Sequence, residues 1–161
     1  MRILGIDPGL RVCGYAVIEV GRGDVELVEA GVLRIDEKMA MEKRLGQIAD
    51  DIKGLLEKFR PEVMAVEDLY SHYAHPKTAI LMGHARGVIL AEACKFGIGV
   101  ESFAATKIKK AVTGNGRASK LQMQKTVQLL LGLAEMPEPA DVADAIAVAM
   151  CALRHVNSAL W

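Results

Sequence analysis

Three segments with the residue content of β-strands open this sequence, and the connections between them are too short to hold a helix. They cover residues 2–7, 12–20 and 24–35 and are rich in β-branched and aliphatic residues. The turn-forming sequences Pro8-Gly9 and Gly-Arg-Gly-Asp at 21–24 separate them. Parallel neighbours need a crossover connection of about a dozen residues or more, so these strands are expected to pair as an antiparallel meander.

Helices and strands alternate after this meander. Apolar residues recur at helical spacing from about residue 39 to 59, and Pro61 ends the pattern. The short apolar strand at 63–66 follows that helix, so it can lie parallel to the first strand by a right-handed crossover. The remaining expected elements are a helix at 76–96, a strand at 98–101 and helices that include 118–131 and 141–156. The predicted fold class is α/β, with a five-stranded mixed sheet flanked by helices on both faces, in a single domain of residues 1–161.

The composition excludes disordered and fibrous proteins and argues against a membrane protein. With 52% hydrophobic residues, the chain can build a substantial core. No apolar run approaches the roughly 18 residues of a membrane span, and the first residues do not resemble a secretory signal, so we expect a cytoplasmic protein without a membrane partner. Cys13, Cys94 and Cys151 are odd in number, widely spaced and set among apolar residues, which predicts buried thiols rather than disulfides or a zinc site.

The formal net charge is zero, from 20 Lys and Arg against 20 Asp and Glu, but the charges are unevenly distributed. Residues 101–125 hold six basic residues and one acidic residue. Such a stretch can lie along a phosphate backbone, or it can be a solvated helix face. Composition alone leaves both interpretations open.

Four acidic residues stand where they can meet. Asp7 ends the first predicted strand and Glu67 ends the fourth, so parallel pairing would bring both carboxylates to one edge of the sheet. Asp141 and Asp144, three residues apart at the start of a helix, share one side of its first turn. Each also has a plainer explanation. Asp7 can be a turn residue, and Glu67 can be a solvated residue at the end of a strand. Asp141 and Asp144 can stabilise a helix N-terminus by capping and by their charge.

Convergence of the four acids would require a cation. Two carboxylates about 4 Å apart repel by roughly 4 kcal/mol at an effective dielectric constant of 20. The set contains only oxygen ligands, which favours hard ions such as Mg²⁺ or Mn²⁺ over zinc. Two such ions about 3.5 to 4 Å apart promote in-line displacement at phosphorus. The sequence therefore predicts hydrolysis of a phosphodiester.

Five motifs in a characteristic order carry a family resemblance. They are Ile-Leu-Gly-Ile-Asp-Pro-Gly at 3–9 with Gly14-Tyr15 after it, Val-Glu-Asp-Leu-Tyr at 66–70, the glycine-bearing segment 83–88, Thr-Gly-Asn-Gly at 113–116, and Asp-Val-Ala-Asp-Ala-Ile-Ala at 141–147. Over nearly the whole chain, from Met1 to about Val156, the sequence resembles the RuvC-type Holliday-junction resolvases. The resemblance implies a ribonuclease H-like fold and a homodimeric, magnesium-dependent endonuclease that makes paired nicks in four-way DNA junctions during recombination and repair.

The resemblance also implies roles for individual residues. The catalytic, metal-binding carboxylates would be Asp7, Glu67, Asp141 and Asp144, holding two Mg²⁺ ions with substrate, for which Mn²⁺ can substitute. Tyr70 would stack on a base near the junction centre, where relatives often carry phenylalanine, and Lys109 and Lys120 would lie near the scissile strand. Gly83 and Gly87 would belong to the dimer helix. A branch-migration motor is the implied protein partner. The chain stops at Trp161, without the basic tail of many relatives.

Some alternatives remain open at this stage. Two glycines four residues apart, Gly83 and Gly87, allow close approach either to the sheet or to a second copy of the chain. The Gly5–Gly9 turn also resembles the phosphate loop of actin-like ATPases and sugar kinases, although 161 residues leave little room for a second lobe. A nuclease of the same fold acting on RNA or flaps is a third hypothesis. His72 and His75 are expected in a solvated loop rather than a zinc site.

Overall fold

A mixed five-stranded sheet organises the chain, and the computed structural model describes residues 1–21, 24–69 and 76–159. The strand order is β3-β2-β1-β4-β5. The first three strands pair antiparallel, and β1, β4 and β5 are parallel neighbours. The strands are β1 (Arg2–Asp7), β2 (Val12–Val20), β3 (Val25–Arg34), β4 (Val63–Glu67) and β5 (Gly99–Phe103). The predicted meander and crossover are therefore confirmed, with β5 placed slightly later than expected.

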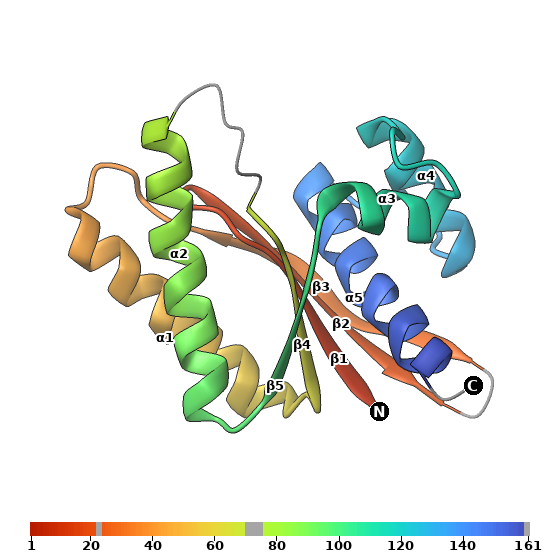
Figure 1. Cartoon of the computed structure of the whole chain (residues 1–161), viewed down its shortest axis with the longest axis horizontal. Helices are drawn as coiled ribbons and strands as arrows, with labels where there is room; N and C mark the ends of the chain where they lie inside the picture. The colour runs from red at the N-terminus through yellow and green to blue at the C-terminus, as the bar shows by residue number, and fades with distance from the viewer. Residues whose placement is uncertain (22–23, 70–75, 160–161) are drawn as a thin grey trace.

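Helices cover both faces of this sheet (Figure 1). One layer holds α1 and α2, and the opposite layer holds α5 with α3 and α4 beside it. The helices are α1 (Met41–Phe59), α2 (Pro76–Lys95), α3 (Ala105–Thr113), α4 (Lys120–Leu130) and α5 (Ala140–Ala159). No helix in the described segments has the length and apolar character needed to cross a membrane.

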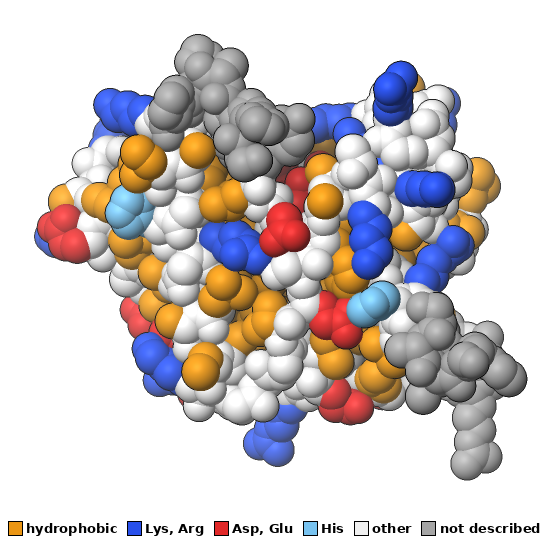
Figure 2. Space-filling view, in the orientation of Figure 1, with side chains coloured by type: hydrophobic (Ala, Val, Ile, Leu, Met, Phe, Trp, Pro, Cys, Tyr) orange, Lys and Arg blue, Asp and Glu red, His pale blue; other side chains and the backbone are white. Residues whose placement is uncertain are grey.

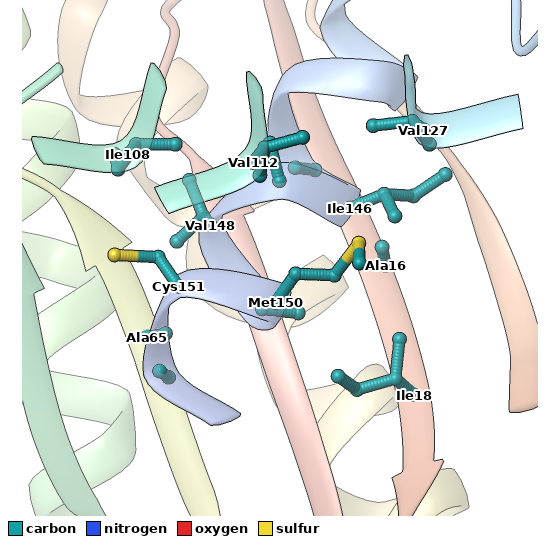
Figure 3. Close-up of a cluster of buried hydrophobic side chains, with 14 of the residues drawn as sticks. Ala16, Ile18, Ala65, Ile108, Val112, Val127, Ile146, Val148, Met150 and Cys151 are labelled. Carbon is teal, nitrogen blue, oxygen red and sulfur yellow. The ribbon is translucent and has the colours of Figure 1, made fainter. Parts of the chain in front are cut away.

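Helix α5 is the centre of one of the two cores. Its residues Ile146, Val148 and Met150 lie among side chains from four other elements (Figure 3). These neighbours are Ala16 and Ile18 of β2, Ala65 of β4, Ile108 and Val112 of α3, and Val127 of α4. Buried residues lie around most of α5, because the sheet covers one side of the helix and α3 and α4 cover others.

Two glycines let the backbone of α5 rest directly on the sheet. A Cβ atom on Gly5 of β1 would overlap the Ala145 carbonyl oxygen and lie 2.7 Å from the Ala149 nitrogen. A Cβ on Gly14 of β2 would overlap the carbonyl oxygen of Asp141. Since these neighbours are main-chain atoms, they cannot move aside as a flexible side chain would. The contact therefore fixes the first turns of α5 over β1 and β2.

A Gly5→Ala substitution is expected to lower the free energy of unfolding by about 1–3 kcal/mol, because overpacking forces the backbone of α5 away from β1. Urea denaturation of the two proteins measures this loss. Gly46→Ala in α1 is the matched control, since no described atom outside the nearby helix backbone lies within 4 Å of a Cβ built there and alanine favours a helix. Equal urea midpoints for Gly5→Ala and the parent would contradict the close backbone contact.

One sequence prediction about the cysteines is wrong. Cys13 and Cys151 are buried, as expected, but Cys94 is exposed. Cys94 lies in the last turn of α2, where the neighbouring Ala93 takes the buried position and Cys94 falls on the solvent side. The apolar residues near Cys94 in the sequence indicate that the helix is partly buried, but they do not show that Cys94 itself faces the core.

Candidate active site

Parallel pairing of β1 with β4 brings the first two acids to one edge of the sheet. Asp7 is the last residue of β1 and Glu67 is the last residue of β4. The residues just before them, Ile6 and Val66, are register partners with no exposed surface. The two buried strands thus end together, each followed by a carboxylate that leaves the apolar interior.

A hollow of about 260 Å³ lies at this edge. Asp7, Glu67 and Asp144 line it, so α5 supplies the third acid. Two lysines, Lys109 and Lys120, line the same hollow. Its remaining walls come from the small or apolar residues Ala105, Ile108 and Met123. The hollow therefore combines three carboxylates, two ammonium groups and an apolar wall.

Asp141, the fourth acid, faces a different space. It lines a neighbouring hollow together with Pro8, Gly9 and residues of α1 and α2. Its charge still acts on the first hollow, because it contributes to the raised pKa values of Asp7 and Asp144. The i, i+3 pair thus spans two adjacent hollows, one carboxylate in each.

Burial and mutual repulsion disfavour ionisation of these acids. Burial, followed by the charges of Glu67, Asp144 and Asp141, raises the pKa of Asp7 to about 8, although Lys120 opposes the shift. Burial and then Asp144 raise the pKa of Glu67 to about 6 against the effects of Lys109 and Lys120. Burial is also the main cause of the raised pKa of Asp144. Without a cation, the hollow therefore holds fewer negative charges at neutral pH than its sequence suggests.

The donor chemistry of the hollow fits a hard divalent cation. All its acidic donors are oxygens, and a cation would offset the repulsion that raises their pKa values. Within the described segments, no three acidic, histidine or cysteine side chains are already grouped as a metal-binding set.

The two lysines are held by well-formed helices. Lys120 is the first residue of α4, whose N-terminus is fixed by a capping box between Ser119 and Gln122. Lys109 follows Ile108 of α3, which is buried in the core. Lysine and arginine side chains also gather over α3 and α4 on the molecular surface (Figure 2). The basic stretch of the sequence is therefore largely a helical surface that extends from the acidic hollow.

The other residues singled out in the sequence are a tyrosine, two histidines and two glycines of α2. Tyr70, His72 and His75 lie outside the described residues. Close packing against the sheet does not explain the α2 glycines. No described atom lies within 4 Å of a Cβ built on Gly87, and one on Gly83 would meet only the Leu69 side chain, at 3.8 Å.

Comparison with known proteins identifies the family to which this chain belongs. The model for "Crossover junction endodeoxyribonuclease RuvC" matches residues 3–152. The chain belongs to the RuvC family. The RuvC of Rhodopirellula baltica is 48% identical over 149 residues, which cover 92% of this chain and 84% of that protein. The RuvC of Moorella thermoacetica is 44% identical over 161 residues, covering 100% of this chain and 94% of the relative.

A solved RuvC structure has the same architecture. Thermus thermophilus RuvC in complex with Holliday junction substrate superposes with a TM-score of 0.92 at 31% identity, covering 99% of this chain and 96% of that one. The predicted ribonuclease H-like fold, a mixed five-stranded sheet between two helical layers, is confirmed. Membership of the RuvC family also removes the reason to treat the Gly5–Gly9 turn as an ATPase phosphate loop.

The apolar residues that line the hollow were not predicted from the sequence. Ile108 and Met123 are almost fully buried and close one side of it, but neither was singled out. The four-residue spacing of Ile108 and Val112 was an available signal for the inner face of α3. Lys109 and Lys120 were found only through the family resemblance, because nothing in a run of basic residues tells which ones turn toward an acidic hollow.

Proposed function

We propose that this RuvC-family protein resolves four-way DNA junctions by metal-dependent hydrolysis of phosphodiester bonds, with residues 1–161 acting as one nuclease domain. Crossover junction endodeoxyribonuclease is the activity named for its family, and the similar Thermus structure holds a Holliday junction. The observation that carries the proposal for this chain is the hollow in which Asp7, Glu67 and Asp144 meet Lys109 and Lys120.

The proposed site would use its acids to hold metal and its lysines to meet phosphate. Asp7, Glu67, Asp141 and Asp144 are the proposed ligands of two Mg²⁺ ions, for which Mn²⁺ can substitute. When bound, such ions activate water and stabilise the leaving oxygen. The ammonium groups of Lys109 and Lys120 attract the scissile phosphate and stabilise charge that develops on its oxygens. The apolar wall formed by Ile108 and Met123 strengthens these interactions by excluding water.

A cleavage panel tests the proposed substrate. Duplex, flap, RNA–DNA hybrid and four-way junction are incubated with the protein, with and without Mg²⁺. We expect paired, symmetric cuts in the four-way junction, only with the metal. Preferential cutting of flaps or RNA would instead support the hypothesis of a processing nuclease on the same fold.

Lys120→Met is expected to reduce kcat for junction cleavage by about 10- to 100-fold, because it removes a cation next to the reacting phosphate. Single-turnover cleavage at saturating protein measures the effect. Lys125→Met on the same helix removes an equal charge from an exposed position outside the hollow. It should keep kcat within about twofold of the parent if general charge attraction affects only binding. Equal kcat losses in both variants would contradict a local role for Lys120.

We propose a homodimer joined through the exposed side of α2, which would account for two nicks in one junction. Gly87 is exposed and unobstructed there, and Ile80 on the same helix is 62% exposed. Gly83 and Gly87, two small residues at the contact, would let two copies of the helix approach closely.

Gly87→Arg is expected to convert the dimer to monomer, as measured by analytical ultracentrifugation. A dimer that persists in this variant would place the interface elsewhere.

The remaining proposals follow from the family resemblance and from the substrate. Tyr70 would stack on an unpaired base, a contact worth about 1 to 3 kcal/mol and tolerant of any sequence. A branch-migration motor would be the protein partner, and the cytoplasm would be the site of action. Base-analogue fluorescence near the junction centre, compared between the parent and Tyr70→Ala, tests the stacking proposal. A pull-down with the purified motor tests the partner.

A further inference from the structure

Arg86, on α2, makes a set of contacts behind the acidic hollow. Its Nη2 atom donates to Asp68 Oδ1 at 2.9 Å and to Ser102 Oγ at 2.6 Å. Its Nε atom donates to the main-chain carbonyl of Glu67 at 3.4 Å. One guanidinium therefore connects α2, the end of β4 and the end of β5. Only 20% of the Arg86 side chain is exposed.

The segment that Arg86 holds is the one that carries Glu67. Val66 and Ser102 are register partners in the sheet, and the Asp68 amide donates to the carbonyl of Phe103 at 2.9 Å. Arg86 thus holds Asp68, which lies one residue beyond the proposed metal ligand Glu67 at the end of β4.

Arg86 is itself firmly placed. Its neighbour Ala85 and Ile89, one turn later, have no exposed surface and anchor α2 in the second core. A planar guanidinium can donate in several fixed directions at once, which an ammonium group cannot reproduce. The side chain is not among the described residues that line the acidic hollow. Its hydrogen bonds reach the segment next to the hollow, at the Glu67 carbonyl and the Asp68 carboxylate.

We infer that Arg86 is a positioning residue that holds the end of β4 so that the Glu67 carboxylate stays in the acidic hollow. The inference rests on the proposed function, because it gives Arg86 a role in junction cleavage. It also links helix α2, the proposed dimer helix, to a catalytic carboxylate through one side chain. Partners that orient a metal ligand typically contribute 10- to 100-fold to metal affinity or activity.

Arg86→Gln provides the main test, in two independent measurements. In single-turnover cleavage we expect kcat to fall about tenfold and the half-saturating Mg²⁺ concentration to rise several-fold, while the Kd for the junction stays within about twofold. In metal-free protein, hydrogen exchange at the Asp68 amide should become faster, because the bond to Phe103 loses its support. Arg86→Lys should recover part of both effects.

A double-mutant cycle identifies the route of the effect. Asp68→Asn alone should weaken the clamp, and adding Arg86→Gln to it should cost less than in the parent. Arg34→Gln, which alters an exposed arginine at the end of edge strand β3, is the matched control and should change neither measurement. If Arg86→Gln does not fold, Ser102→Ala carries the test, with a smaller loss of kcat and faster exchange at Asp68.

Two outcomes would overturn the inference. One is an Arg86→Gln protein with parental kcat and parental exchange at Asp68. The other is weaker junction binding with unchanged kcat, which would make Arg86 a DNA contact. A parent protein that cuts no junction would instead defeat the proposed function. The exchange measurement would still decide whether Arg86 holds the end of β4, because it needs neither metal nor DNA.

Discussion

An Asp7→Asn protein is expected to bind a four-way junction at least as tightly as the parent and to cut it at least about 10³-fold more slowly. The amide keeps the size of the side chain but removes the charge of a proposed metal ligand, and loss of about 4 kcal/mol of transition-state stabilisation gives this factor. Binding should persist or improve, because the amide cannot carry the negative charge that Asp7 faces toward phosphate when it is ionised beside a cation. Single-turnover cleavage and a binding titration in Ca²⁺ measure the two effects separately.

The control for this prediction is a second aspartate outside the hollow. Asp50 lies on α1, in the opposite helical layer, and is exposed. Asp50→Asn makes the same chemical change and should leave both cleavage and binding unchanged. Parental cleavage by Asp7→Asn would show that the acidic hollow is not where the phosphodiester is hydrolysed.

The metal-free protein is expected to lose stability as the pH rises from about 5.5 to 8.5. Burial and neighbouring carboxylates raise the pKa of Asp7 to about 8 from its ordinary value of 3.8. Between these values the folded state holds a proton that the unfolded chain has released. The stabilisation is therefore complete below pH 3.8 and disappears as the pH passes through about 8. Integrated from pH 5.5 to 8.5, the loss amounts to about 3 kcal/mol.

Urea denaturation in EDTA across this pH range measures the loss. Asp7→Asn should flatten the dependence and be more stable than the parent at pH 8.5, as is common when a charged active-site group is neutralised. Asp50→Asn should retain the parental slope. Mg²⁺ should stabilise the parent most at high pH, where the acids are ionised. A parent whose unfolding free energy does not change over this range would contradict the raised pKa of Asp7.

The order of the sheet and the edge at which the acids meet were accessible from the sequence. Short turns at 8–9 and 21–24 left the first three strands little choice but to pair antiparallel. The helix before β4 then made a parallel crossover natural, so Asp7 and Glu67 had to emerge together. The short turns and the helix before β4 are local features of the sequence, and chain connectivity then determines how the strands pair.

The detailed placement of side chains was not accessible in this way. The division of Asp141 and Asp144 between two hollows depends on how α5 is rotated against the sheet, which two acids three residues apart do not specify. Arg86 was missed for a related reason. Its side-chain partners Asp68 and Ser102 are 18 and 16 residues away, and an arginine in a helix carries no sign of them.

The close contact of α5 with Gly5 and Gly14 makes the position of the acidic residues largely independent of the side chains in the core. The distance from the start of α5 to the end of β1 depends mainly on contacts between main-chain atoms, which the two glycines permit. Ile146 and Met150 pack elsewhere in the core, where volume-conserving exchanges between apolar residues typically cost less than about 1.5 kcal/mol. Such exchanges can therefore accumulate in the core without changing the distance between α5 and the end of β1.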